Sequence, residues 1–376
     1  MSLSAVQEGR LKRKLRKLIQ QGASVSGKQI LEVFQAELPA LSDPMTIANK
    51  LVEAGLLVEL KDDEQASKRM RGGFDEEIQY TMVAESDADF ILNQRTIPKQ
   101  RANPVIVKAS QLAVELRKKI MSLFGKFLRD DGSGVDYAGA AQSAELEEYG
   151  EIAEQLCNVN VWDLEHEIPD RNERMALYLN LYNALVIHGH IAIGDPTTPA
   201  ERGQFFTKTA YKVGDEVWSL DVIEHVFLRC NKPKAFAANP LLDSTDKRTK
   251  HALVLPVDYR IHFALNCGAK SCPPIRFYSA EKLDDQLTMA CKGFFRDDTN
   301  ILVSHQDRKV KLTKLLEWYG SDFAPNQRDM LQAVATFLEG DKRAQLDSVL
   351  SEKESFIVEF FVYDWTENNA NTSNVV

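Results

Sequence analysis

Residues 174–193 read RMALYLNLYNALVIHGHIAI, a run that predicts a helix with apolar residues on nearly every side. Its length approaches that of a membrane span, but two asparagines and two histidines would be costly in hydrocarbon. We therefore expect the buried central helix of a soluble core. Asn180 and Asn183 lie three residues apart, on one helix face. Two roles remain open for these amides: they pin neighbouring loops, or they form part of an active-site face.

The composition around this helix is that of an ordinary globular protein. The chain has 376 residues, of which 44% are hydrophobic and 27% charged, and this length predicts two domains. Lys and Arg total 46 and Asp and Glu total 55, so the net charge is −9 and we expect no specific nucleic-acid binding. Residues 1–10 lack the apolar core of a signal peptide, which predicts a cytoplasmic protein whose five cysteines are thiols or metal ligands.

The second informative stretch is DYRIHFALNCGAKSCPPIR, residues 258–276. Its apolar part, 261–267, predicts a buried strand that Cys267 closes, and the following glycine and prolines predict a turn. Cys272 lies in that turn with Lys270 and Arg276 near it in sequence. Nearby cations lower the pKa of a thiol and favour its nucleophilic form.

These cysteines have three competing interpretations. In the first, Cys272 or Cys267 is a nucleophile and His262 or His225 is its base, as in a hydrolase or acyl transferase. In the second, the two cysteines, in C-x4-C spacing, and the same histidines bind zinc. This spacing is wider than the common C-x2-C, and our main expectation is a protein without a cofactor. In the third, the cysteines pack as small hydrophobic residues.

Two further segments offer groups that support a catalytic cysteine. Residues 217–229, VWSLDVIEHVFLR, predict a strand that turns into a helix carrying Glu224 and His225. Near the end of the chain, residues 356–363 predict a strand that places Asp364 and Trp365 at its mouth. We expect Asp364 or Asn183 to orient the histidine.

The N-terminal part predicts short helices followed by a β-hairpin, the size of a winged-helix module. Residues 11–20 predict a basic amphipathic helix, either a solvated first helix or a surface for a protein partner or an anionic membrane. Its basic residues are Arg10, Lys12, Arg13, Lys14, Arg16 and Lys17. Residues 11–83 include SGKQILEVFQAELPALSDPMTIANKLVEAGLLVEL and GFDEEIQYTMV, and they resemble the DEP domain. That resemblance implies a targeting module that can associate peripherally with membranes.

The C-terminal part resembles the domain of unknown function 547 family over residues 172–368. The motifs MALYLNLYNALVIH, SLDVIEHVFLR, the cysteine segment, KLLEWYGSDF and VYDWTEN occur in the family's order. The family pattern falls on Asn180, Tyr182, Asn183, Glu224, His225, Arg229, His262, Cys267, Cys272, Pro273, Arg276, Trp318, Tyr363, Asp364 and Trp365. The resemblance implies no reaction, although some relatives carry a glutaredoxin domain, which hints at thiol chemistry.

We therefore expect an α+β protein with a buried central helix and a mixed or antiparallel sheet. The expected segments are a DEP-like domain (1–84), a linker (85–110), a helical connector (111–171), the larger domain (172–368) and a frayed tail (369–376). The leading hypothesis is a papain- or transglutaminase-like hydrolase or acyl transferase acting on a small molecule or peptide. Its expected catalytic residues are Cys272, Cys267, His262, His225, Glu224, Asn183 and Asp364. Its expected substrate-binding residues are Arg276, a carboxylate anchor, with Asn180, Tyr182, Arg229 and Trp365. The rival is a non-catalytic signalling adaptor with a structural Cys/His cluster.

Overall fold

The structure of the chain is a computed structural model, and its helices and small sheets confirm the α+β class. The structure describes residues 11, 14–15, 25–37, 43–53, 57–59, 79–82, 90–93, 109–130, 134–235, 237–351, 355–366 and 369–370.

Helix α8 (Arg171–Ala192) is the predicted central helix. Its N-terminus is capped by Asp170, whose side chain accepts a hydrogen bond from the Glu173 backbone N–H. A Cβ atom built at Gly189 would lie 2.8 Å from the Phe205 ring, so glycine permits the close packing of helix α9 (Pro199–Lys208). No helix among the described residues is long and apolar enough to cross a bilayer.

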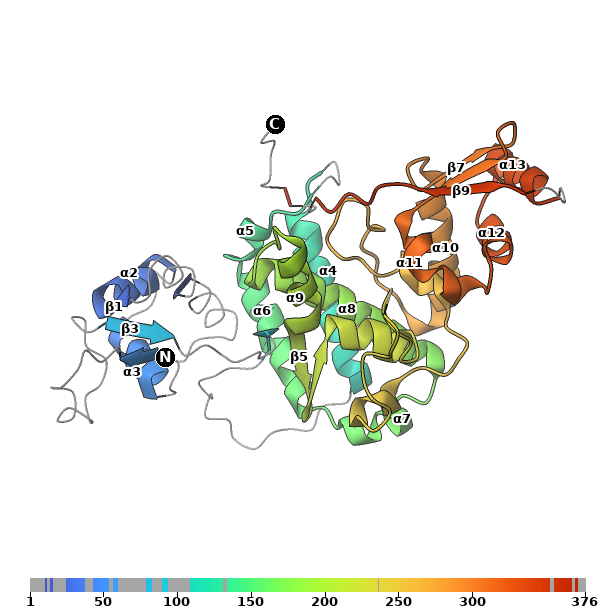
Figure 1. The fold of residues 1–376 in the computed structure, drawn as a ribbon. Helices are drawn as coiled ribbons and strands as arrows, with labels where there is room; N and C mark the ends of the chain where they lie inside the picture. Colours follow the sequence, from blue (N-terminus) through green and yellow to red (C-terminus); the bar gives the residue numbers. More distant parts are fainter. Residues whose placement is uncertain are drawn as a thin grey trace.

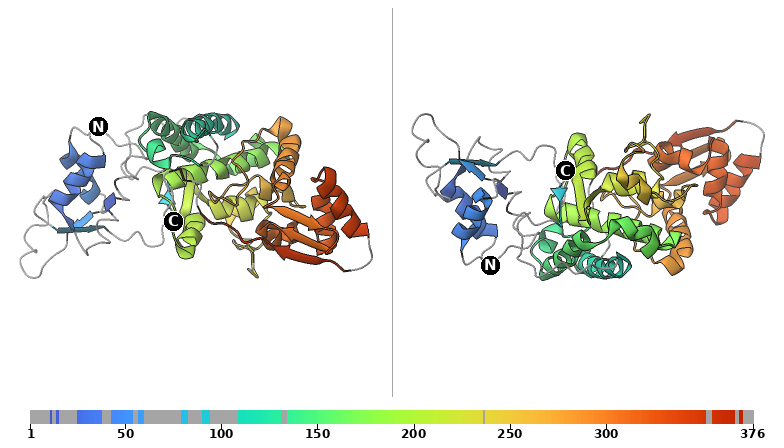
Figure 2. Two further views of the ribbon diagram at one scale, coloured as in Figure 1. Left: turned by 90° about the horizontal axis from the view of Figure 1, so that it is seen from above. Right: turned by 90° about the horizontal axis from the view of Figure 1, so that it is seen from below.

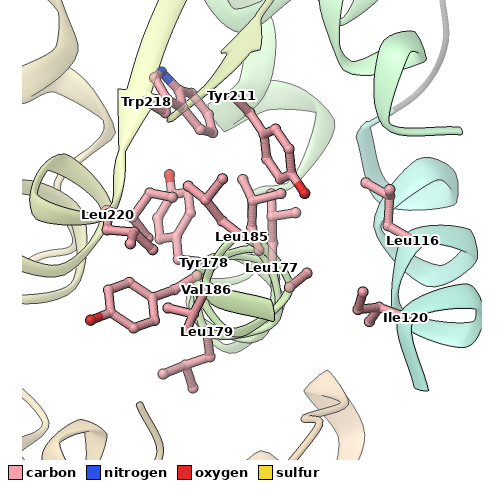
Figure 3. Close-up of a cluster of buried hydrophobic side chains, with 14 of the residues drawn as sticks. Leu116, Ile120, Leu177, Tyr178, Leu179, Leu185, Val186, Tyr211, Trp218 and Leu220 are labelled. Atoms are coloured by element: carbon pink, nitrogen blue, oxygen red, sulfur yellow. The ribbon is translucent and has the colours of Figure 1, made fainter. Parts of the chain in front are cut away.

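The first hydrophobic cluster surrounds α8. Helices α4 (Ala109–Phe127) and α6 (Ala144–Ala153) lie beside it (Figure 1). Leu116 and Ile120 of α4 point toward α8, while Tyr211 and Trp218 cover another side of the same helix (Figure 3). The expected connector at 111–171 is thus part of this core, because its apolar residues are buried directly against α8.

A small mixed sheet borders this cluster. Strand β4 (Phe90–Ile91) runs parallel to β5 (Thr209–Val213), which pairs antiparallel with β6 (Glu216–Ser219). The expected linker at 85–110 is therefore wrong at residues 90–93. The buried side chain of Asn93 donates hydrogen bonds to the Ala153 and Lys212 carbonyls, which anchors this segment to the core.

A second hydrophobic cluster is formed mainly by the C-terminal part of the chain. The helices and strands that carry it, drawn in orange and red, lie together in Figures 1 and 2. Its sheet has the order β7-β8-β9, with β8 antiparallel to β7 and parallel to β9. Its elements are α10 (Leu283–Arg296), β7 (Ile301–Ser304), β8 (Lys309–Leu312), α11 (Lys314–Phe323), α12 (Gln327–Ala335), α13 (Gly340–Ser351) and β9 (Ile357–Phe360). The predicted terminal strand is confirmed in β9, and the sheet is mixed.

The predicted strand at 261–267 is wrong. Residues Tyr259–Phe263 form a short 3-10 helix, η6, which Asp258 caps by accepting a hydrogen bond from the Arg260 backbone N–H. The Ala264 N–H then bonds to the Ile261 carbonyl, and the chain continues as a loop through both cysteines. Local hydrogen bonds therefore satisfy the backbone groups that a strand would pair with a neighbouring strand.

The described residues of the N-terminal part include two short helices, α2 and α3, and a small antiparallel sheet of order β1-β3-β2. Its elements are β1 (Val25–Ser26), α2 (Gly27–Glu37), α3 (Pro44–Glu53), β2 (Leu57–Glu59) and β3 (Gln79–Met82). Of the expected basic surface, Lys14 pairs with Glu37 at 3.0 Å. The other five basic residues, Arg10, Lys12, Arg13, Arg16 and Lys17, lie outside the described residues.

Several short helices complete the larger part of the chain. They are α5 (Tyr137–Ala140), η2 (Glu154–Asn158), η3 (Val161–Asp163), α7 (Leu164–Glu167), η4 (Val222–Leu228), η5 (Lys247–His251) and η7 (Ala280–Lys282). At the far end, Asn369 and Ala370, which we expected in a frayed tail, are bonded to the core. The Ala370 N–H donates to the Val135 carbonyl, and the Asn369 amide donates to Asp195.

Candidate functional site

A cavity of about 380 Å³ lies where the two hydrophobic clusters meet. Its walls come from α8, η4, η6, the cysteine loop, α11 and the segment after β9. The expected site residues that line it are Tyr182, Glu224, His225, His262, Cys267, Cys272 and Trp365. Residues that are distant in sequence are thus brought to one concave surface, the usual setting of a binding or active site.

The two cysteines of the loop are joined as a disulfide. The prediction that both are free thiols or metal ligands is therefore wrong in this structure. The Cys267 backbone N–H points to the Cys272 sulfur at 2.9 Å, and the Tyr363 hydroxyl lies 3.1 Å from the same sulfur. Among the described residues, no histidine nitrogen is within hydrogen-bond distance of either sulfur.

His262 is oriented by a buried carboxylate. Its Nε2 lies 2.9 Å from Asp322 Oδ2 on α11, and its ring stacks on Tyr319 with the ring centroids 4.1 Å apart. Burial lowers the pKa of His262, and the neighbouring Asp322 offsets part of that effect. Burial alone would raise the pKa of Asp322, but hydrogen bonds from His262 and Arg229 outweigh it and hold that pKa well below its usual range.

The resulting charge states define the chemistry of this pair. A neutral imidazole that donates from Nε2 to an ionised carboxylate keeps its lone pair on Nδ1. Asp322 therefore presents His262 in the tautomer that a general base requires.

His225 lies on a short π-helix, η4, in which the Arg229 N–H bonds to the Glu224 carbonyl five residues back. Arg229 Nη1 lies 3.0 Å from His225 Nδ1, and a guanidinium can only donate, so this ring nitrogen is the acceptor. The ring proton is then on Nε2, which faces Asp221 at 3.6 Å. Both nitrogens of His225 are engaged, so His262 is the better placed base.

Arg229, expected to bind substrate, instead supports the two histidines. Its Nε donates to Asp322 at 2.7 Å, and its side chain is nearly fully buried. Lys232 also pairs with Asp322. Burial would raise the pKa of Asp221, but His225 and Lys234 outweigh it and lower that pKa. Asp322 behind the cavity and Asp221 in its wall are thus ionised and paired.

Glu224 accepts hydrogen bonds from two tyrosines that line the cavity. Tyr182 donates from α8 at 3.1 Å and Tyr319 donates from α11 at 3.0 Å. Burial, followed by the nearby Glu224 carboxylate, raises the pKa of both phenols well above the ordinary value. These phenols stay protonated at neutral pH and fix the Glu224 carboxylate in place.

Asn180 and Asn183 are buried and hold the cysteine loop against α8. The Asn183 amide donates to the carbonyls of Ala264 and Arg276, and its oxygen accepts from the Asn266 N–H. Asn180 exchanges two hydrogen bonds with the backbone of Tyr278. Of the two roles left open for these amides, the structure places them in loop pinning, and neither lines the cavity.

Two other expected residues lie outside this cavity. Asp364 is exposed, accepts a hydrogen bond from the Thr366 N–H and orients neither histidine. Arg276 is also exposed, and its guanidinium approaches Gly293 of α10. The carboxylate that orients His262 is Asp322, which sequence reasoning missed although it lies in the KLLEWYGSDF motif. Asp322 lies four residues after Trp318, and side chains at this spacing share one face of a helix. This spacing is the sequence feature that could have indicated Asp322.

No group of three or more His, Cys, Asp or Glu side chains in the described part of the chain could hold a metal ion. Here Cys267 and Cys272 bond to each other, and His262 bonds to Asp322. The zinc interpretation therefore lacks a ligand cluster among these residues.

The larger part of the chain is thus an α+β region with a pocket lined by cysteine and histidine. A comparison with family models supports the predicted family resemblance over part of this region. Residues 166–295 match the family described as Protein of unknown function, DUF547. The match contains α8, η4 and the cysteine loop, while Trp318, Asp322 and Tyr363 lie beyond it. The family comparison detects no DEP domain in the chain. Comparisons with curated proteins and with solved structures found no match.

Proposed function

We propose that the pocket is the active site of a thiol-dependent hydrolase or acyl transferase, with Cys272 as nucleophile and His262 as base. The observation that carries the proposal is the presence of Cys272 in the same cavity as a neutral histidine that Asp322 orients. The N–H of Cys267 and the hydroxyl of Tyr363 both face the Cys272 sulfur, and such donors stabilise a thiolate. Cys272 is therefore the preferred nucleophile, and Cys267 its disulfide partner.

The proposed reaction begins when a dithiol reductant reduces the Cys267–Cys272 disulfide to two thiols and is itself oxidised to a disulfide. His262 lies beyond hydrogen-bond distance of the sulfur, so in the proposed step the Cys272 proton passes to His262 Nδ1 through an intervening water. The thiolate attacks an acyl carbon while the carbonyl electron pair moves to oxygen. Collapse of this adduct expels the leaving group, which takes the proton from His262, and a thioester remains. Water or another acceptor then cleaves the carbon–sulfur bond and regenerates the thiol.

The test is the rate of iodoacetamide labelling of each cysteine between pH 5 and 9, resolved by mass spectrometry after reduction. We expect Cys272 to label rapidly below pH 7 and His262→Ala to slow it by about tenfold or more. The matched control is His305→Ala, an exposed histidine remote in sequence. Cys230 and Cys291 serve as internal references, because burial raises the pKa of both thiols. Slow labelling at all five cysteines would overturn the proposal.

The second candidate function is a non-catalytic adaptor in which the Cys/His cluster is structural. It is favoured by the disulfide itself and by the hydrogen-bond partners of the sulfurs, which are Tyr363 and backbone rather than histidine. This candidate predicts slow labelling after reduction and an unchanged rate in His262→Ala.

For the N-terminal part we propose a DEP-like targeting module that binds an anionic membrane through the basic segment at residues 10–17. Support comes from six Lys and Arg residues within that segment and from the helices and antiparallel sheet that follow. The test is sedimentation with phosphatidylserine vesicles against phosphatidylcholine vesicles. Loss of binding in Lys12→Glu/Arg13→Glu/Lys17→Glu supports the proposal, whereas equal recovery with both vesicles favours a protein partner.

A further inference from the structure

A second cavity of about 590 Å³ opens beside the cysteine pocket. Tyr363 and Trp365 line both cavities, so the segment after β9 forms a shared wall. The second cavity also contains a basic residue, Arg202 of α9, that sequence reasoning did not select.

Arg202 has no paired carboxylate among the described residues. Its guanidinium lies over the Trp365 ring, 4.6 Å from the ring centroid, and its Nε is buried with no hydrogen-bond partner. Within the part of the chain that the structure describes, no carboxylate lies within ion-pair distance of it. By contrast, Arg229 and Arg260 each pair with an aspartate. A buried donor without an acceptor is costly, so a ligand that supplies an acceptor gains free energy at this place.

We propose that Arg202 and Trp365 bind a carboxylate of the substrate, next to the acyl position at Cys272. This inference rests on the proposed thiol chemistry of the neighbouring pocket. A guanidinium that lies over an indole ring still has N–H donors at its edge, and a planar carboxylate can accept two parallel hydrogen bonds from them. Arg202 thus takes the role that we expected of Arg276, whose side chain lies outside both cavities.

The charge of the second cavity favours a monoanion over a phosphate. Besides Arg202 the wall includes Asp364, and hydrogen bonds from Thr366 hold the pKa of that carboxyl below its usual value. Among the described residues of this wall, Arg202 is the cation and Asp364 the anion, and the repulsion from Asp364 is stronger for a dianion than for a monoanion held by Arg202. A carboxylate can come from a peptide C-terminus or from an acidic side chain, and both carry this chemistry.

The first test measures binding to the full, oxidised chain by isothermal titration calorimetry. The probes are hippurate, which resembles a peptide C-terminus, and 4-phenylbutyrate, which resembles an acidic side chain. Hippuric amide and inorganic phosphate are the controls. We expect at least one carboxylate probe to bind about tenfold more tightly than hippuric amide and phosphate, and the tighter of the two identifies the source. Equal binding of hippurate and its amide would overturn the proposal.

The second test uses variants that remove the guanidinium. Arg202→Ala should weaken carboxylate binding by about tenfold or more, and Arg202→Lys should restore part of it, because a single ammonium replaces the planar donor pair. Arg296→Ala is the matched control, since Arg296 is an exposed arginine at the end of α10. Its binding should equal that of the unchanged chain. Thermal unfolding shows whether the Arg202→Ala variant is folded. Unchanged carboxylate binding by this variant would overturn the proposal.

These tests separate this inference from the proposed reaction, because they need no free thiol. If carboxylates bind through Arg202 but Cys272 labels slowly after reduction, the subsite stands and the thiol enzyme falls. If Cys272 labels rapidly but carboxylate binding is the same in Arg202→Ala as in the unchanged chain, the thiol proposal stands and the subsite proposal is wrong.

Discussion

Asp322 organises the buried polar groups beside the cavity at the scale of single residues. It bonds to His262 and Arg229 and pairs with Lys232, while its own side chain is fully buried. The ionised carboxylate therefore compensates a buried guanidinium and selects the tautomer of a histidine at the same time. Replacing it affects both stability and thiol chemistry.

We predict that Asp322→Asn lowers the free energy of unfolding by about 3 kcal/mol, because Arg229 is left buried without its counter-charge. Urea denaturation measures this change. Asp298→Asn is the matched control: Asp298 pairs with Lys342 at the surface, and its loss should cost about 0.5 kcal/mol or less. In the reduced protein, Asp322→Asn should also slow Cys272 labelling below pH 7. Equal stability of the two variants would contradict this account of Asp322.

His188 gives a pH dependence that does not involve the cavity. It is buried in α8, bonds to the Tyr211 hydroxyl at 3.0 Å, and burial lowers its pKa to about 3. The unfolded histidine titrates near pH 6.5. Between these pKa values the unfolded chain binds more protons than the folded chain, so stability falls as the pH falls below about 6.5.

We predict that His188→Gln reduces the slope of unfolding free energy against pH by about 1.4 kcal/mol per pH unit between pH 6 and 4. Urea titrations at each pH measure the slope. His305→Gln, at an exposed position, should keep the slope of the unchanged chain. An unaltered slope in His188→Gln would show that His188 charges readily in the folded state.

At the scale of elements, α8 is both the hydrophobic centre and the support of the cysteine loop. Its apolar residues fill the first cluster, while Asn180 and Asn183 replace the neighbouring strand that the loop lacks. Side-chain amides can carry out this pairing because they present a donor and an acceptor, like a peptide group. The loop geometry, and with it the position of both sulfurs, is tied to this helix.

We predict that Asn183→Ala lowers the free energy of unfolding by about 3 kcal/mol, because three backbone groups lose their buried partner. Hydrogen exchange should accelerate at the Asn266 amide, which Asn183 protects in the folded chain. The control is Asn326→Ala, which removes the N-cap of α12 and costs about 1 kcal/mol. Faster exchange at Asn266 in the control as well would contradict a local role for Asn183.

At the scale of the whole molecule, the two clusters are connected by the segment that follows β9. Strand β9 completes the second sheet, and Tyr363 and Trp365 then line both cavities. The segment continues to Asn369 and Ala370, which bond to the first part of the core. Both cavities therefore depend on a segment contributed by the end of the chain.

We predict that a chain ending at Ser351 loses protection in β8 and α11 while α8 stays protected. The removed segment supplies β9 to the second sheet, whereas its bonds to the first cluster reach Val135 and Asp195 and not the buried apolar residues of α8. Hydrogen exchange with mass spectrometry measures both regions. A chain ending at Ala370 is the control and should exchange like the full chain. Equal loss of protection in α8 and β8 would show that the two clusters unfold as one unit.

Sequence patterns predicted the elements that depend on neighbouring residues. The apolar run of α8 and the strand-to-helix turn before Glu224 were confirmed because local hydrogen bonds, caps and periodicity define them. The apolar run at 261–267 satisfied the same strand criteria and was misassigned. Its conformation depends on Asn183, which lies about eighty residues earlier, and periodicity contains no information about such a partner.

The sequence by itself determined the α+β class, the central helix and the residue types of the site. Tertiary structure decided which of them meet: Asp322 rather than Asp364 orients His262, Cys267 pairs with Cys272, and Arg202 rather than Arg276 faces a cavity. The physical reason is the separation in sequence of the interacting residues. Helices and caps form within a few residues, whereas a cavity between two clusters is set by packing of side chains that are distant in sequence.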